Sequence, residues 1–170
     1  IATFLMLPET NARPEPEAAH PMRIIAGYRG LLGHRAYVGY VLCCAFAYSG
    51  IFSFISGSSF VFIDVIGLPP NAFGFCFAAI VIGYMIGTTL AGRLSHRFHL
   101  DRLIAVGTAI ALVNGALMVG LAVIGLATSG LARVLAIVLP MLAYMIGIGL
   151  VLPNSIAGAI GPFPRAAAGN

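Results

Sequence analysis

Charge is the scarcest property of this 170-residue sequence. Only 8% of its residues are charged, and neither Lys nor Trp occurs, whereas soluble domains contain about 25% charged residues. Apolar residues make up 60% of the chain, and a globule of this size would expose large apolar patches to water. The shortage of charge therefore excludes an ordinary soluble domain. We expect an integral membrane protein surrounded by the lipid bilayer.

Cysteine is also scarce, and its spacing excludes several kinds of site. The three cysteines form no CxxC pair and have no metal-ligand spacing, so we interpret them as small packing residues. His96 and His99 have no third ligand of metal character except Asp101, so no metal site is predicted. Neither a cofactor nor an enzymatic activity is expected. The net charge of +4 is spread over loops and indicates membrane orientation rather than binding to nucleic acid.

The few charged residues divide the chain into intervals of membrane-crossing length. Four uncharged intervals of 28, 28, 30 and 31 residues lie between Arg35 and Arg165. A transmembrane helix needs about 20 apolar residues, so each interval is predicted to hold one span. The predicted spans are residues 37–60, 72–92, 103–124 and 134–157. Region 37–170 is expected to contain these spans and the start of the next, and residues 1–7 to be the end of an earlier one.

Arginine is unevenly distributed between the two sides of these spans. Eight of the nine Arg fall on one side, and Arg133 alone falls on the other. Short cytoplasmic loops retain positive charges, so the side with eight Arg is predicted to be cytoplasmic. This orientation places the central loop, residues 8–36, in the cytoplasm of a multi-pass protein of the inner, or plasma, membrane.

The central loop is predicted to be a linker followed by a short helix. Pro8 to Pro21 holds four Pro and three Glu, which is typical of a flexible linker. From Met22 onward, a helix would place five apolar side chains on one face: Ile24, Ile25, Tyr28, Leu31 and Leu32. That pattern indicates a helix lying on the membrane surface. Because three glycines weaken this helix, a frayed lead into the next span is the alternative.

Small residues recur at four-residue steps in the second predicted span: Ala79, Gly83, Gly87 and Ala91. Lipid does not drive apolar side chains together, so membrane helices associate through close backbone approach at small residues. This pattern predicts a helix-packing seam. It therefore favours a multi-helix bundle over isolated membrane anchors.

A stripe of aromatic residues follows one face of the first predicted span. Tyr40, Tyr48 and Phe52 belong to it, and such a face can bind hydrophobic or cationic solutes by stacking and cation–π contacts. Tyr144 and Asn154 are comparable polar points in the last span. All five are candidate substrate contacts. The alternative is that the end tyrosines anchor in the membrane interface and the others pack against helices or lipid.

None of the five acidic residues falls inside a predicted span. Asp64 lies just outside the first span, Asp101 lies in a predicted cytoplasmic loop, and three Glu lie in the linker. Ion-coupled membrane proteins normally bury a carboxylate as proton carrier. A proton carrier is therefore expected elsewhere in a longer parent chain, or unusually close to the membrane surface.

The stretch Gly92–Leu103, GRLSHRFHLDRL, resembles the loop signature G-x-L-a-D-R-x-G-R-R-R-L of the major facilitator superfamily, in the weaker copy of the second half. Five residues match, whereas His96 replaces the signature Asp and His99 the Gly. The matching residues are Gly92, Leu94, Arg97, Arg102 and Leu103. The resemblance implies a conformational loop motif that comprises Gly92, Arg93, Arg97, Asp101 and Arg102.

Three further stretches resemble Bcr/CflA-type drug-resistance transporters of that superfamily. Leu7–Thr10 is similar to the P-E-T ending of their sixth span, and Ile55–Val61 to their I-S-G-S-P-F-V run. Gly147–Asn154, followed by Pro162-Phe163-Pro164, is similar to their tenth span and the loop after it. The resemblance implies an all-α, polytopic helical bundle. It would be a partial major facilitator fold from the C-terminal half, running from the end of span 6 to the start of span 11.

The same resemblance implies a function. Members of this group export hydrophobic or amphipathic drugs in exchange for protons by alternating access, and the first and last complete spans are expected to face the central cavity. The implied partners are a small-molecule substrate, protons and the N-terminal half of the same transporter. Two alternatives are a transporter of small metabolites on the same fold and a membrane sensor or scaffold that does not transport.

Overall fold

The computed structural model describes residues 21–123 and 131–161, and every regular element in these ranges is helical. In chain order the elements are α2 (Pro21–Leu32), α3 (Arg35–Ser59), the π-helix η2 (Phe60–Val65), α4 (Pro70–Leu94), α5 (Leu100–Val123) and α6 (Leu131–Ile160). Four helical segments are long and apolar enough to cross a membrane: residues 35–65, 70–94, 100–121 and 131–160. The prediction of an all-α membrane bundle is confirmed.

Helix α3 continues past the predicted end of the first span. η2 extends it to Val65, so Asp64 lies in the last helical turn rather than just outside the helix. The backbone amides of Ile66 and Gly67 donate to carbonyls of η2, and the segment contains no Pro or Gly that would stop it. The helix ends only at Gly67, whose φ of 79° is a left-handed conformation.

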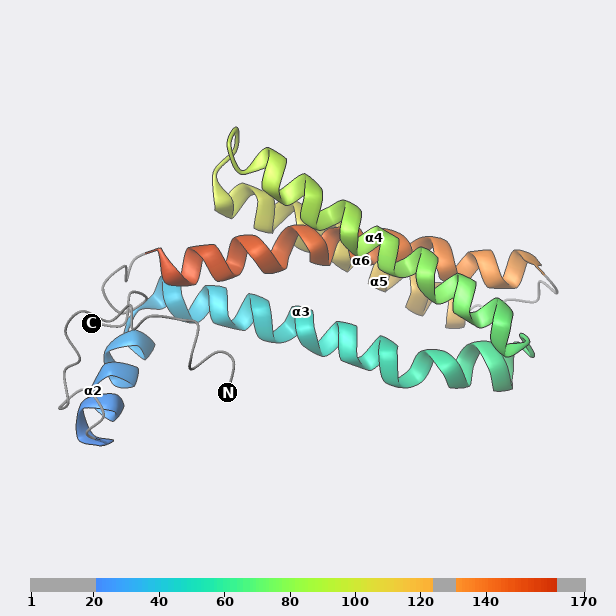
Figure 1. Cartoon of the computed structure of the whole chain (residues 1–170), viewed down its shortest axis with the longest axis horizontal. Coiled ribbons are helices and arrows are strands. Elements are labelled where there is room, and N and C mark those ends of the chain that lie inside the picture. The colour runs from blue at the N-terminus through green and yellow to red at the C-terminus, as the bar shows by residue number, and fades with distance from the viewer. Residues whose placement is uncertain (1–20, 124–130, 162–170) are drawn as a thin grey trace, which may run out of the picture.

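Helix α2 is separate from α3 and turns away from its axis (Figure 1). Tyr28 and Leu32 on α2 are both exposed, and a surface position in the membrane stays a prediction. Several other predicted features lie outside the described residues: the end of an earlier span at 1–7, the first part of the linker and the start of the next span.

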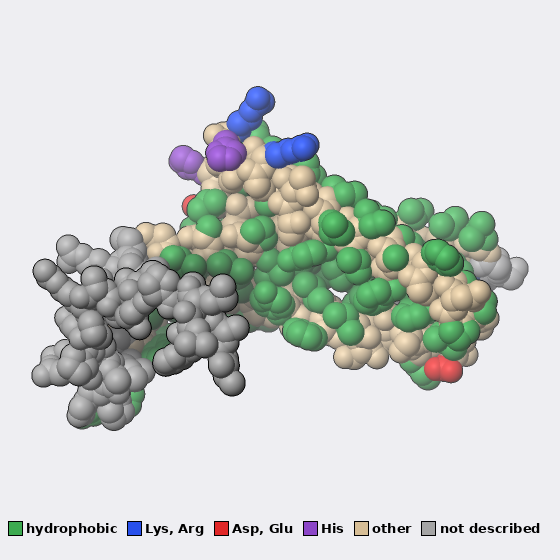
Figure 2. Space-filling view, viewed as in Figure 1, with side chains coloured by type: hydrophobic (Ala, Val, Ile, Leu, Met, Phe, Trp, Pro, Cys, Tyr) green, Lys and Arg blue, Asp and Glu red, His purple; other side chains and the backbone are tan. Residues whose placement is uncertain are grey.

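Helix α6 lies at the centre of the bundle and packs against α5, α4 and α3 (Figure 1). In the most apolar stretch of α6, 56% of the residues are buried inside the bundle, whereas the figure is 6% in the most apolar stretch of residues 35–65. The other three long helices therefore depend on α6 more than on one another. Many of their large apolar side chains point outward, as the surface of Figure 2 shows.

Pairs of glycines bring the backbones of these helices together. A Cβ atom added at Gly107 on α5 would lie 2.6 Å from the carbonyl oxygen of Gly147 on α6. On the other side of α6, Gly149 approaches Gly87 of α4 equally closely, with the Gly87 Cα 2.8 Å from where its Cβ would stand. Such close approach is the way helices in lipid gain contact.

The predicted seam of α4 lies on this contact with α6. Gly83, Gly87 and Ala91 are buried, and Ala79 is half-buried. A Cβ at Gly83 would lie 2.6 Å from the carbonyl oxygen of Leu142. The seam side of α4 thus faces α6, which directs the large side chains of α4 toward α3 and toward the outside of the bundle.

Candidate functional site

Two concavities flank the line of contact between α3 and α6. The first, the α3–α4 cleft, lies between α3 and α4 and has a volume of about 260 Å³. Its lining is Tyr48, Ile51, Phe54, Ile55, Phe77, Ile80, Val81, Tyr84 and Met145. Only the hydroxyl groups of Tyr48 and Tyr84 are polar among these side chains. The cleft can therefore accommodate an apolar or aromatic group, which would meet an almost entirely apolar surface.

Phe52 lies beside the α3–α4 cleft on the same face of α3. Its ring centroid is 6.5 Å from that of Tyr48, and the two side chains are 62% and 46% exposed. Large aromatic side chains bury most of their surface when they serve only the core of a domain. These two remain free to contact lipid, another part of the protein or a solute.

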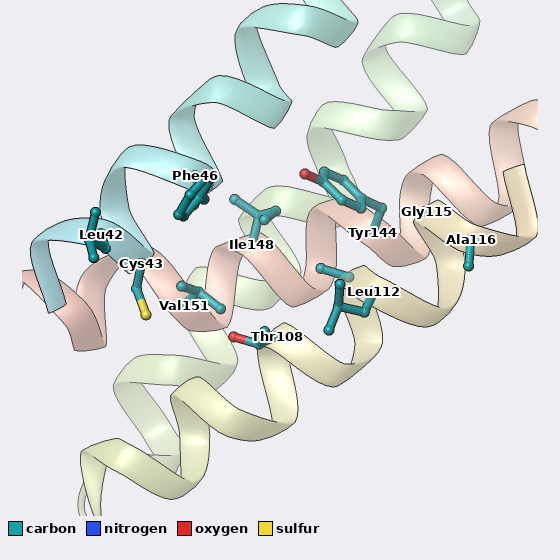
Figure 3. Close-up of a pocket in the computed structure, with 12 residues that line it drawn as sticks. Leu42, Cys43, Phe46, Thr108, Leu112, Gly115, Ala116, Tyr144, Ile148 and Val151 are labelled. Carbon is teal, nitrogen blue, oxygen red and sulfur yellow. The ribbon is translucent and has the colours of Figure 1, made fainter. Parts of the chain in front are cut away.

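The second concavity, the α3–α5 groove, lies on the opposite side of α3 and has a volume of about 590 Å³ (Figure 3). Its lining is Leu42, Cys43, Phe46, Ala47, Thr108, Ala111, Leu112, Gly115, Ala116, Tyr144, Ile148 and Val151. A neighbouring concavity of about 370 Å³ extends it toward η2 and shares Gly115 and Tyr144. The groove is larger than the cleft and almost entirely apolar.

Tyr144 projects from α6 toward α3 between the two parts of the α3–α5 groove (Figure 3). Gly50 makes this position available, because a Cβ at Gly50 would overlap the Tyr144 hydroxyl and stand 3.1 Å from the ring carbon that bears it. The glycine thus sets the distance between α3 and α6 at the middle of the bundle.

We expect the substitution Gly50→Ala to lower the free energy of unfolding by about 1–3 kcal/mol, because overpacking forces side chains off their preferred rotamers. Tyr144→Phe removes the overlapping oxygen, so the double variant should regain a substantial part of that loss. Thermal unfolding of the four proteins in detergent measures both effects. Equal stability losses with and without the hydroxyl would show that Tyr144 is not the limiting contact.

The predicted substrate contacts do not converge on one site. Tyr48 lines the α3–α4 cleft and Tyr144 lines the α3–α5 groove. Asn154 is 3% exposed and donates from its side-chain Nδ2 to the Leu150 carbonyl at 2.7 Å. Tyr40 lies near the N-terminal end of α3, where its hydroxyl donates a hydrogen bond to Asp101 of α5. Only Tyr48 and Phe52 of the five lie together.

The loop motif spans the end of α4, the turn that follows it and the start of α5. Its members Gly92, Arg93, Arg97, Asp101 and Arg102 are all exposed, and Figure 2 shows Arg and His side chains gathered at this end of the molecule. The Arg102 guanidinium lies 5.9 Å from the centroid of the Phe98 ring, within the range of a cation–π contact. Within the described ranges, no three His, Cys, Asp or Glu side chains come close enough to hold a metal ion.

Comparison with known protein families decides how these helices are classified. The family model described as MFS/sugar transport protein matches residues 1–160. The chain belongs to the major facilitator superfamily. No solved structure matches this superfamily chain significantly.

Three relatives of this superfamily chain are similar at low identity. An uncharacterized MFS-type transporter, YdgK of Bacillus subtilis, is 29% identical over 76% of this chain and 31% of its own length. A bicyclomycin resistance protein homolog of Haemophilus influenzae is 24% identical over 66% and 28%. Multidrug resistance protein D of Escherichia coli is 26% identical over 95% and 39%. The chain thus spans roughly a third of the length of the curated relatives it matches.

Tyr84 also lines the α3–α4 cleft, although the sequence patterns did not indicate it as a substrate contact. It lies in the middle of α4 and contributes the second phenol ring of the α3–α4 cleft. The available signal was a polar-tipped aromatic in the middle of a membrane span, next to the small residue Gly83. Because the seam directs Gly83 toward α6, the adjacent Tyr84 is rotated about 100° toward α3.

Proposed function

We propose that the whole protein that contains this sequence is a secondary active transporter that exports hydrophobic or amphipathic drugs by alternating access, in exchange for protons. The α3–α4 cleft, with Tyr48, Phe52 and Tyr84, forms part of its substrate site. The observation that best supports this proposal is the apolar and aromatic lining of this cleft, to which Tyr48 and Tyr84 contribute two phenol rings. The printed names of two relatives, which refer to bicyclomycin resistance and multidrug resistance, agree with it.

The lining of the α3–α4 cleft favours aromatic substrates over highly polar ones. Two phenol rings and Phe52 provide stacking surface, and their faces attract cations. No charged side chain belongs to the residues that line the cleft. Recognition of a drug here would therefore depend on shape, stacking and one or two hydrogen bonds, which permits a range of substrates.

A second candidate function is the transport of a sugar or another small polar metabolite. The description of the matching family includes sugar transport, and this is the observation that favours it. A sugar needs many convergent hydrogen-bonding groups, because each polar group left unpaired in a dry site costs free energy. The α3–α4 cleft supplies two hydroxyls, which is why we place drug efflux first.

The proton carrier of the proposed exchange is expected outside the middle of these four spans. The described residues contain two carboxylates, Asp64 near the end of η2 and Asp101 at the start of α5. A carrier buried in the membrane centre would be a carboxylate held inside the bundle. We therefore assign the carrier to another part of the transporter or to a carboxylate near the membrane surface.

Transport by the whole protein in inverted membrane vesicles tests the proposal. Vesicles energised with a proton gradient should accumulate an aromatic cation such as ethidium, and addition of the cation should release protons from the vesicle interior. Vesicles without the protein are the control, and a protonophore should abolish accumulation. Uptake of labelled glucose with no ethidium transport would favour the second candidate. Absence of transport of either compound by protein of verified abundance would contradict the proposal.

A further inference from the structure

One hydrogen bond joins α3 to α5 across a separation of 61 residues in the chain. The Tyr40 hydroxyl, in the second turn of α3, donates to Asp101 Oδ1 at 2.6 Å. Asp101 lies in the first turn of α5. A hydrogen bond of this length from a hydroxyl to a carboxylate belongs to the stronger, charge-assisted class. It connects the start of α5 directly to the helix that bears the aromatic stripe.

The Tyr40 ring is also seated against the end of α6. A Cβ added at Gly158 would lie 2.8–2.9 Å from three atoms of the ring, Cζ, Cε1 and Cε2. Any larger residue at 158 would have to displace the ring, and with it the hydroxyl that reaches Asp101. Tyr40, Gly158 and Asp101 therefore form a junction of three helices at one end of the bundle.

Between its two ends, helix α3 is held by apolar contacts with α6 and by the stacking of Phe54 on Phe77 of α4, with ring centroids 5.9 Å apart. Its buried residues are Ala47 and Ser58, and the α3–α4 cleft and α3–α5 groove separate it from its neighbours on both sides. The opposite end is anchored more firmly, because Phe62 of η2 is 1% exposed and packs on Phe73 with ring centroids 5.8 Å apart. Apolar contacts are not directional and tolerate a small change of helix tilt, whereas the hydrogen bond fixes the position of the first turns, so the tilt of α3 can change at this end when the junction opens.

We propose that the Tyr40–Asp101 hydrogen bond is a latch that sets the tilt of α3 and opens when the transporter changes its access state. Tyr48 lies two turns, or about 12 Å, along α3 from Tyr40. Movement of the latched end about the Phe62 anchor would therefore change the width of the α3–α4 cleft. This role rests on the function proposed above. It also assigns Tyr40 to positioning α3 rather than to contact with substrate, since Tyr40 lines none of the three concavities.

Hydrogen–deuterium exchange of the whole protein in lipid nanodiscs tests the latch without any transport assay. Tyr40→Phe keeps the ring and removes the donor, and Gly158→Ala keeps both bonding groups and displaces the ring. Both variants should increase amide exchange in the first turns of α3 by about fivefold, because a lost hydrogen bond lets that end open more often. Exchange in η2 should not change.

A conservative change and two controls separate the latch from a general loss of stability. Asp101→Asn keeps an acceptor oxygen and should show a smaller increase than Tyr40→Phe. Tyr28→Phe on α2 is a matched control, because Tyr28 is exposed. Gly74→Ala is the other, because nothing lies within 4 Å of its added Cβ. Neither control should alter exchange in α3.

Unchanged exchange in the first turns of α3 for Tyr40→Phe would overturn the latch, as would an equal increase in α3 and η2. If Gly158→Ala does not fold, the comparison of Tyr40→Phe with Asp101→Asn decides the question. The exchange result does not depend on transport. A wild-type protein that shows the expected exchange pattern but transports neither ethidium nor glucose would contradict the proposed function and leave the junction itself established.

Discussion

Replacement of Gly107 by Val is expected to prevent α5 from packing on α6 and to cost the bundle about 3 kcal/mol or more. A Cβ at this position would stand 2.6 Å from the Gly147 carbonyl oxygen and 2.9 Å from side-chain atoms of Leu150 and Val151. A backbone oxygen cannot move aside as a side chain can, so the two helices must separate. Thermal unfolding in detergent and the yield of monodisperse protein measure the loss.

The chain offers a matched control on the same helix. Gly120 lies in α5, and nothing lies within 4 Å of its added Cβ. Gly120→Val should therefore change the free energy of unfolding by no more than about 0.5 kcal/mol. If both substitutions cost the same, the effect would come from the β-branched residue in the helix and not from the contact of α5 with α6.

The same experiment applies to the contact between α4 and α6. A Cβ at Gly87 would overlap the Ile146 carbonyl oxygen and lie 2.9 Å from the Gly149 Cα. Gly74 is the open control on α4. We expect Gly87→Val to be as damaging as Gly107→Val and Gly74→Val to be tolerated.

Replacement of Tyr48 and Phe52 by Ala is expected to reduce export of aromatic cations about tenfold or more. Stacking and cation–π contacts contribute about 0.5–2 kcal/mol each, so loss of two aromatic faces corresponds to roughly one to three orders of magnitude in transport at low substrate concentration. The initial rate of ethidium accumulation in inverted vesicles measures this, at protein levels matched by immunoblot.

Phe46 provides the control that distinguishes the two concavities. It lies on the same helix, is 73% exposed, and lines the α3–α5 groove instead of the α3–α4 cleft. Phe46→Ala should leave ethidium export within about twofold of the wild type, since it removes apolar area from a different surface. A larger loss with Phe46→Ala than with the Tyr48 and Phe52 pair would move the substrate site to the α3–α5 groove.

Tyr84→Phe examines the contribution of a hydroxyl rather than a ring. The substitution keeps the aromatic face in the α3–α4 cleft, so transport of a purely apolar cation should be retained. A substrate that accepts a hydrogen bond from this hydroxyl should lose about fivefold in apparent affinity, the usual net effect of one neutral hydrogen bond. Equal effects on both kinds of substrate would contradict the assignment of the hydroxyl to recognition.

Some of the arrangement could be predicted from single residues. The four-residue steps of Gly83 and Gly87 predicted a packing side of the second span, and that side faces α6. The aromatic stripe predicted Tyr48 and Phe52 as neighbours, and their rings lie 6.5 Å apart. Both patterns are local, because residues three or four apart share one helix face whatever surrounds the helix.

Other contacts could not be predicted, because they join residues far apart in the chain. Nothing in the spacing of Tyr40 and Asp101 indicates that they meet, and the pairing of Gly50 with Tyr144 is equally invisible. Each depends on how two helices are rotated and tilted against each other. A single sequence does not contain that information when the membrane-spanning helices are apolar on nearly all sides.

The sequence by itself determined that lipid surrounds this protein and that its apolar segments are helical. Its low charge is incompatible with a water-exposed domain. Lipid requires every backbone group to be hydrogen-bonded within the protein, and continuous apolar runs of this length meet that requirement as helices. Tertiary structure alone decided which aromatic residues line the same cleft and which contact other parts of the bundle. The physical reason is that glycine contacts such as Gly107 with Gly147 set the rotation of each helix about α6. That rotation directs Tyr48 and Tyr84 into one cleft, Tyr144 into the opposite groove, and Tyr40 toward Asp101.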